Sequence, residues 1–356
     1  MHFIDIAIIF LYLAAVVAAG AWFGRRQQTT SRYFFAGQQV PWWAIGASIV
    51  ATETSTITFI SVPGIAYARG GNFTFLQIVF GYVIARFVIS FLFMPAYFRK
   101  ELVTVYELLQ SRFGGAVKGL TASLFVVMRT IADGVRLLLT AIVLAAVFSS
   151  MHIVAGTTAI SASVIGIGLV MIVFTLMGGM EAVVWIEVVQ LGIYIGGALA
   201  AAIILAQHIP GGVSAAVAIA SAHQKFRFLD FAIDATKSYT FWAGVIGGCF
   251  LTMSTHGTDQ YLVQRYLCTD KPRKAAMALL ASGVVVLLQF IGFLFIGVLL
   301  FAFYRPDLLP NYATLAPPRR SVRPTRSSPT SSRATCRSAS PDSSSLRSSP
   351  PRCRRR

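Results

Sequence analysis

A chain of 356 residues with 56% hydrophobic and only 12% charged side chains is too apolar for a water-soluble domain, in which about a quarter of the residues carry charge. Its mean hydropathy of +0.70 predicts an all-α polytopic membrane protein whose side chains mostly face lipid. The net charge of +17 is concentrated in residues 305–356, where twelve Arg lie among Ser and Pro without interleaved aromatics, a pattern that excludes a nucleic-acid-binding surface.

Eight stretches are long and apolar enough to cross the hydrocarbon core, which takes about 20 residues of helix. We predict these spans at 3–23, 44–68, 75–98, 119–148, 158–177, 181–206, 241–260 and 275–304. Lysine and arginine favour cytoplasmic loops. With the N-terminus outside, eleven of them fall in cytoplasmic segments and four in outer segments, so we predict a multi-pass protein of the plasma membrane in that orientation.

The second span contains an unusual polar run. Six hydroxyl or carboxylate side chains lie between Thr52 and Thr58, and Pro63 follows. Serine and threonine bond to their own backbone and proline removes a donor, so we expect the helix to be interrupted. Carbonyl oxygens freed by such a break are suitable ligands for a hard cation such as Na⁺. An ordinary polar helix face inside a bundle is the alternative.

The fourth span carries Arg129, Asp133 and Arg136 at spacings of four and three, which place them on one helix face. Charge inside a membrane is costly and is functional or tightly paired. One hypothesis is that Arg136 receives an anionic group of a solute, because guanidinium matches carboxylate geometry. The equal alternative is an internal ion-pair network that includes Glu53 or Glu187.

Three segments of the chain resemble the sodium:solute symporter family. They are residues 32–37 (RYFFAG) with 40–43 (VPWW), residues 178–190 (GGMEAVVWIEVVQ), and residues 258–267 (TDQYLVQRYL). Their order and separation match the family, and the resemblance covers residues 3–304. It implies a LeuT-type helical bundle, an extra N-terminal helix followed by two five-helix inverted repeats.

On that plan the symporter core is residues 1–304. Residues 3–23 are the extra helix, 44–206 supply the first repeat, and 241–304 supply two helices of the second, so we expect an incomplete second repeat in a truncated transporter. The resemblance implies that Ala51 and Thr54 offer backbone carbonyls to Na⁺. The family's hydroxyl ligands from its eighth core helix have no counterpart, which implies a partial sodium site.

The resemblance also implies substrate positions, which differ from the sugar-transporting members of the family. They fall on Thr58, Gln77, Thr252 and Thr255, and they disfavour a sugar. Together with Arg136 they favour a small organic anion such as a carboxylate. The candidates for ion coupling or for pairing are Glu53, Asp133 and Glu187.

The Ser-, Pro- and Arg-rich segment 305–356 cannot bury a core, so we expect it to be disordered. We interpret it as an aberrant, out-of-frame ending. A natural disordered tail is the alternative.

The function expected from these features is sodium-coupled import of a small organic solute across a lipid bilayer. Na⁺ is the coupling ion, and no other cofactor or metal is expected. His152, His208, His223 and His256 are scattered and form neither a metal cluster nor a nucleophile–base pair, so we expect no enzyme activity and no catalytic residues. The alternatives are a non-transporting fragment of such a symporter and, further away, a channel or an intramembrane enzyme.

Overall fold

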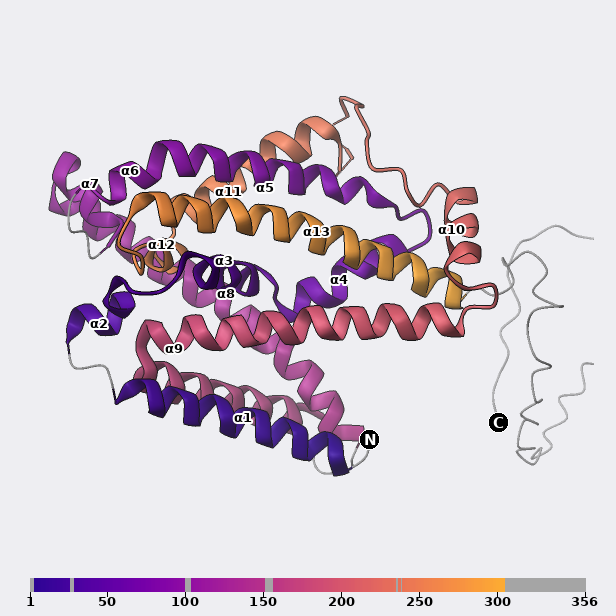
Figure 1. Cartoon of the computed structure of the whole chain (residues 1–356), viewed down its shortest axis with the longest axis horizontal. Coiled ribbons are helices and arrows are strands. Elements are labelled where there is room, and N and C mark those ends of the chain that lie inside the picture. Colours follow the sequence, from indigo (N-terminus) through magenta and orange to yellow (C-terminus); the bar gives the residue numbers. More distant parts are fainter. Residues whose placement is uncertain are drawn as a thin grey trace, which may run out of the picture. The chain divides into compact units, whose positions relative to one another are not determined.

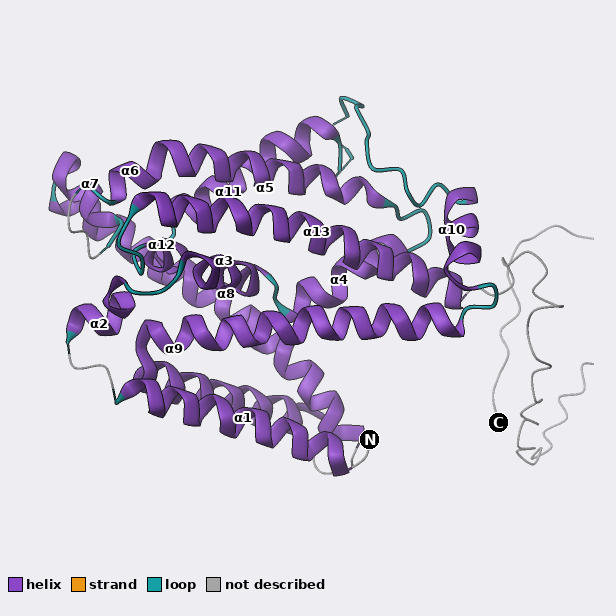
Figure 2. Ribbon diagram, viewed as in Figure 1, coloured by secondary structure: helices purple, strands orange, loops and turns teal. Residues whose placement is uncertain are grey.

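The computed structural model describes residues 3–25, 29–99, 104–150, 156–234, 236–237 and 239–304. Within these ranges every regular element is a helix, as Figure 2 shows. The first helices are α1 (Phe3–Gly24), α2 (Thr30–Phe35), η1 (Ala36–Gln38), α3 (Trp42–Glu53), α4 (Thr56–Tyr67), η2 (Phe73–Phe75), α5 (Leu76–Val88), η3 (Ile89–Phe93), α6 (Met94–Tyr97) and α7 (Tyr106–Phe113). They are followed by α8 (Gly115–Ser150), α9 (Gly156–His208), α10 (Gly212–Ala222), η4 (Ala243–Gly247), α11 (Gly248–Thr252), η5 (Met253–Thr258), α12 (Gln260–Tyr266) and α13 (Pro272–Tyr304).

Five of these helical stretches are long and apolar enough to cross a membrane, and the pair α3–α4 makes a sixth if it is counted as one bent span. The predicted spans 158–177 and 181–206 both fall within α9, and the predicted span 241–260 falls on η4, α11 and η5. Helix α10 lies between the predicted spans 181–206 and 241–260. The tail 305–356 lies outside the described residues.

Helix α9 turns back on itself at a glycine. Gly179 has φ 59° and ψ −164°, which no helix accommodates, yet helical structure continues on both sides of it. In Figure 1 the two arms of α9 run side by side in opposite directions, and α1 packs along the first arm. A side chain at this position would lie 2.8 Å from the carbonyl oxygen of Tyr33, so both the backbone angle and the packing require glycine.

The polar second span is interrupted, which confirms the prediction from its sequence. Helix α3 ends at Glu53, helix α4 begins at Thr56, and the two axes differ by 66°. Ser55 is extended and caps α4, because its hydroxyl accepts a hydrogen bond from the N–H of Thr58 at 3.3 Å.

A second interruption lies two hundred residues further along the chain, at residues 258–259. The segment η4–α11–η5 alternates between π-helical and α-helical turns and ends at Thr258. Asp259 is extended there, and its carboxylate caps α12 by accepting from the N–H of Tyr261 at 2.8 Å. Short π-helical stretches inside α-helices are frequent at functional sites.

Helix α13 lies at the centre of the bundle and packs against α3, α4, α5 and α9. Small residues allow these close crossings. A side chain at Gly297 would collide with the carbonyl of Pro63 in α4. A side chain at Gly81 of α5 would lie 2.5 Å from the carbonyl oxygen of Val245. Helices in membranes associate through such small-residue contacts, because lipid provides no hydrophobic drive between them.

Apolar side chains cover the outer surfaces of the bundle. Along α8, Leu124, Met128, Ile131 and Val135 are all more than half exposed. A water-soluble bundle would bury a stripe of this kind, whereas a lipid-facing helix displays it. The buried interior is mostly apolar as well, but it also holds polar and charged groups such as Arg86, Glu187 and Arg265, and these define the candidate site.

Candidate functional site

The break between α3 and α4 leaves two backbone oxygens without their helical partners. In a continuous helix the carbonyl of Ala51 would accept from the N–H of Ser55, but that N–H donates to the carbonyl of Glu53 at 3.1 Å. Likewise the N–H of Thr58, which would serve the carbonyl of Thr54, donates to the Ser55 hydroxyl. Ala51 and Thr54 are both buried. Two buried carbonyls free of helix bonding fit a hard cation such as Na⁺.

The side chain of Thr54 is already engaged. Its hydroxyl donates to the carbonyl of Val50 at 2.7 Å and accepts from Gln289 Nε2 of α13 at 2.8 Å. The carbonyl of Thr54 is therefore the group available for an ion, while Gln289 fixes α13 against the end of α3.

Glu53, the last residue of α3, is the centre of a buried polar cluster. Both of its carboxylate oxygens lie 2.6 Å from Nη2 of Arg86 in α5, and the Arg86 side chain is fully excluded from solvent. Arg86 also donates to the Ser282 hydroxyl of α13 at 3.2 Å. On its other side Glu53 Oε1 lies 2.7 Å from Nε2 of His256 in η5. The cluster thus ties the first interruption to the helix that leads into the second.

Glu187 of α9 forms a second buried cluster against the same helix. Its carboxylate pairs with Arg265 of α12 at 2.6 Å and accepts hydrogen bonds from the hydroxyls of Ser48 and Thr52, which lie one turn apart on α3. The guanidinium of Arg265 is 1% exposed and also lies over the ring of Tyr261. Pairing of this kind is what permits charge in a low-dielectric core.

The charged face of α8 is organised differently. Arg129 pairs with Asp133 at 2.8 Å and with Asp259 at 3.5 Å, so it links α8 to the cap of α12. Arg136 lies 3.5 Å from Asp133, and both of these side chains are about half exposed. Glu53 and Glu187 form the internal ion pairs that the alternative hypothesis anticipated, but their partners are Arg86 and Arg265 instead of Arg136.

Two of the remaining predicted substrate residues lie next to the Glu53 cluster. The hydroxyl of Thr58 donates to the carbonyl of Glu53 at 3.3 Å, and the hydroxyl of Thr255 lies 2.9 Å from Nδ1 of His256. Thr252 is buried one turn before His256. Thr58 and Thr255 therefore contact the Glu53 cluster directly, and Thr252 lies one turn from it.

Gln77 is engaged elsewhere. Its amide nitrogen donates to the carbonyls of Thr74 and Tyr239, and its oxygen accepts from the N–H of Asp230 at 2.9 Å. The side chain is fully buried and holds the segment before η4 against the start of α5. In this structure Gln77 therefore connects two backbone segments by hydrogen bonds.

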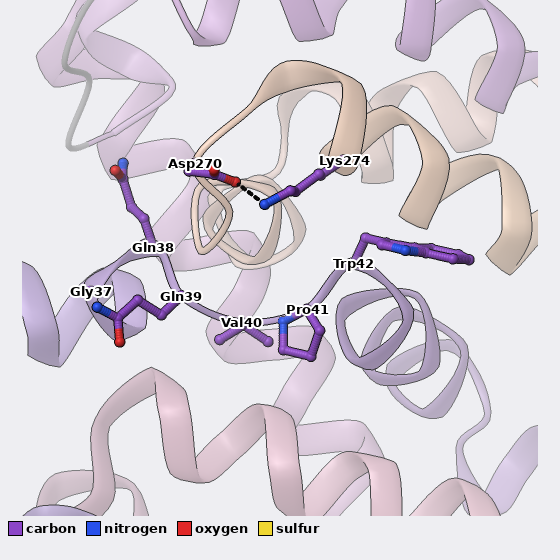
Figure 3. A pocket seen from close by; sticks show the side chains of 8 residues that line it. All are labelled: Gly37, Gln38, Gln39, Val40, Pro41, Trp42, Asp270 and Lys274. Atoms are coloured by element: carbon purple, nitrogen blue, oxygen red, sulfur yellow. Dashed lines mark ion pairs between the residues drawn. The ribbon is translucent and has the colours of Figure 1, made fainter.

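A cavity of about 590 Å³ lies at the entrance to α3, away from these clusters. Figure 3 shows it lined by residues 37–42 together with Asp270 and Lys274, which form an ion pair at 2.7 Å. The Lys274 ammonium holds the pKa of the Asp270 carboxyl below its usual range. Because the cavity lacks the freed carbonyls and buried charges described above, we place the functional site at the α3–α4 break.

The sequence model of the Sodium:solute symporter family matches residues 33–317. The chain belongs to this family. A sodium/sialic acid symporter of Proteus mirabilis is 32% identical over 317 residues, 86% of this chain and 60% of the relative. A sodium/sialic acid symporter of Aliivibrio fischeri is 32% identical over 85% of this chain and 58% of the relative, and the human sodium/iodide cotransporter is 30% identical over 84% and 45%.

The fold agrees with a solved member of the family. A substrate-bound, outward-open structure of a Na⁺-coupled sialic acid symporter matches with a TM-score of 0.75 and 28% identity, over 87% of this chain and 63% of that one. The chain therefore has the predicted all-α, LeuT-type fold of a multi-pass membrane protein. It spans about three fifths of the length of these sialic acid symporters.

Sequence reasoning missed several residues of the site. Arg265 lies in a polar stretch between two predicted spans, where the sequence suggests a loop, and His256 is one of the scattered histidines that no spacing links to another polar group. Gln289 and Ser282 are single polar residues in the apolar stretch 275–303 of α13. Their presence in so apolar a helix is a signal that could have identified them, because polar groups in membrane helices bond to neighbouring helices.

Proposed function

We propose that this chain is the core of a sodium-coupled symporter that imports a small organic anion, such as a carboxylate, across the plasma membrane. The observation that carries the proposal is the pair of buried carbonyls, on Ala51 and Thr54, that the α3–α4 break leaves without helical donors. In a lipid-embedded bundle such oxygens are stable only with another partner, and Na⁺ is the cation that fits them.

The anionic character of the solute rests on charge balance. Arg86 and Arg265 are each paired with a glutamate of their own, and Arg129 pairs with both Asp133 and Asp259, whereas Arg136 shares Asp133 with Arg129. Of these four arginines, Arg136 therefore has the most capacity left for a carboxylate. The relatives are named for sialic acid, iodide and monocarboxylates, all of which are anions.

The assignment of sites follows the sequence. Thr58, Thr252 and Thr255 contribute hydroxyls to the solute, and Gln77 holds the backbone at Asp230 and Tyr239 near it. Residues 44–206 form the first structural repeat and 241–304 contribute to the second, with α1 outside both and the N-terminus on the outer face. Alternating access moves the two repeats around the level at which both interrupted helices break.

The test is uptake by this chain in liposomes. With Na⁺ outside, an inward sodium gradient should drive saturable accumulation of at least one of three labelled probes, namely N-acetylneuraminate, pyruvate and iodide. Replacing Na⁺ with K⁺ should abolish it. Absence of Na⁺-dependent uptake of any probe, together with absence of ²²Na⁺ binding, would refute the proposal.

The role of Arg136 is tested separately. Arg136→Ala should raise the KM for the transported carboxylate about tenfold or more, because a charge-assisted pair is lost. Arg112→Ala, in the amphipathic helix α7, is the matched control and should leave the KM unchanged. Unaltered carboxylate affinity in Arg136→Ala would remove this residue from the solute site.

A further inference from the structure

The cavity at the start of α3 is a second polar site, separate from the α3–α4 break. Its volume of about 590 Å³ is typical of cavities that bind small molecules, which span about 300–1,000 Å³. Residues 37–42 line one side of it, and Asp270 and Lys274 lie across from them (Figure 3). Two opposite charges in one cavity suit a ligand that itself carries both signs.

The wall formed by residues 37–42 is held in place by the backbone. Residues 36–38 have φ angles between 50° and 61°, a region that alanine and glutamine rarely adopt. Such a conformation persists only where the surrounding structure holds it. Here the N–H of Val40 donates to the carbonyl of Cys268 at 3.3 Å, which fixes this wall to the turn that precedes Asp270.

The ion pair in the cavity can be exchanged for a ligand. Lys274 Nζ lies 2.7 Å from Asp270 Oδ1, and the two side chains are 45% and 44% exposed. An ion pair at this exposure contributes little to stability, because water screens both charges. A ligand that offers an anionic group to Lys274 and a cationic group to Asp270 therefore replaces the pair without leaving either charge alone.

The cavity lies at the level of lipid headgroups. The apolar stretch 275–303 of α13 starts directly after Lys274, and α13 is long and apolar enough to cross a membrane. Trp42 and Trp43 begin α3, and Trp43 is 49% exposed. Tryptophan is enriched at membrane–water interfaces. The molecules that surround such a cavity are phospholipids, and their headgroups carry phosphate.

We propose that this cavity binds the headgroup of phosphatidylethanolamine, with the phosphate on Lys274 and the primary ammonium on Asp270. The phosphate accepts charge-assisted hydrogen bonds from the lysine, and the ammonium has three N–H donors for the carboxylate. Phosphatidylglycerol brings no cation to Asp270. Phosphatidylcholine brings a quaternary ammonium without an N–H donor. The site thus selects one zwitterionic headgroup, whatever solute the chain transports.

The selectivity is tested by native mass spectrometry of the full, delipidated chain in detergent. Phosphatidylethanolamine, phosphatidylglycerol and phosphatidylcholine with identical acyl chains are titrated separately. The first should bind about fivefold more tightly than the other two, since only it satisfies both charges. Equal Kd values for the three lipids would refute the proposal. Soluble glycerophosphoethanolamine should not compete at the concentration at which the lipid saturates, and competition there would assign the cavity to a water-soluble phosphate compound instead.

The roles of the two charges are separated by substitution. Asp270→Asn should abolish the preference for phosphatidylethanolamine over phosphatidylglycerol, because the partner of the ammonium is lost. Lys274→Gln should weaken binding of phosphatidylethanolamine about fivefold or more. Glu107→Gln, which removes one side of the pair between Lys118 and Glu107, is the matched control and should leave the preference intact. A full preference in Asp270→Asn would exclude the carboxylate from the site.

The position of the lipid is tested in nanodiscs. Phosphatidylethanolamine with a diazirine close to its glycerol should crosslink to peptides that contain residues 37–42, and Lys274→Gln should lower that yield about fivefold. The same diazirine on phosphatidylcholine reports general contact with the lipid-facing surface. Equal yields at residues 37–42 from the two lipids would mean that the cavity does not recognise the headgroup.

Discussion

Arg265 and Glu187, from helices far apart in the chain, form a 2.6 Å ion pair in which the arginine side chain is 1% exposed. The carboxylate is held in addition by the hydroxyls of Ser48 and Thr52. This arrangement joins α12 and α9 to α3 immediately before the break. A buried pair of this kind is fully compensated only when both partners are present.

Removal of one partner should therefore be costly. Arg265→Gln should lower the free energy of unfolding by about 3–5 kcal/mol, because Glu187 is left buried without a counter-charge. Thermal unfolding in detergent micelles measures this. Arg227→Gln is the matched control, since Arg227 is half exposed and its pair with Asp230 is worth at most about 1 kcal/mol. Equal unfolding temperatures for the two variants would contradict a structural role for the pair.

The crossing of α13 with α4 depends on the absence of a side chain at Gly297. Gly297→Ala should destabilise the bundle by about 1–3 kcal/mol, because the new methyl group collides with the carbonyl of Pro63. Gly292→Ala, in the same helix, meets no atom within 4 Å and should be neutral. The comparison is made by denaturant unfolding of both variants, and an equal effect of the two substitutions would contradict a collision specific to Gly297.

The hydrogen bonds of Gln77 to neighbouring backbone should slow the amide hydrogen exchange of that backbone. Gln77→Ala removes three hydrogen bonds to Thr74, Tyr239 and Asp230, so the amide hydrogens around Asp230 and Tyr239 should exchange faster, by about tenfold or more. Hydrogen–deuterium exchange detected by mass spectrometry measures this. Gln110→Ala in α7 serves as the control. Unchanged exchange would mean that other contacts hold the segment.

The thiols of Cys268 and Cys249 should differ in reactivity. Cys268 is fully buried in the turn between α12 and α13, and burial raises the pKa of its thiol to about 12, so almost no thiolate exists at pH 8. In single-cysteine variants, Cys268 should react with maleimide only after unfolding, whereas the partly exposed Cys249 should react with a membrane-permeant maleimide in the folded protein. Rapid labelling of folded Cys268 would disprove the burial.

Local sequence was sufficient to predict the interruption of the second span. The run of hydroxyls from Thr52 to Thr58 competes with helical hydrogen bonding, and the break appears at this point. The helical fold could also be predicted from the sequence, because the length of each apolar stretch decides whether it can span the lipid bilayer as a helix.

The partners of the buried charges could not be predicted in the same way. Glu53 and His256 are joined by the packing of four helices, and no spacing along the chain encodes their contact. The burial of Arg265 could not be predicted either. Its polar neighbours in the sequence suggest an exposed loop, whereas in the structure its side chain is buried and pairs with Glu187.

The reversal at Gly179 joins the two arms of α9 without the extended backbone that a loop would have. Helical residues flank the bend directly, so the two arms of α9 are joined with almost no backbone outside them. Such a joint offers a protease no extended substrate. An affinity tag inserted at this bend would disrupt the packing of α2 against α9. Reporters for topology mapping should therefore be inserted in other connections of the chain.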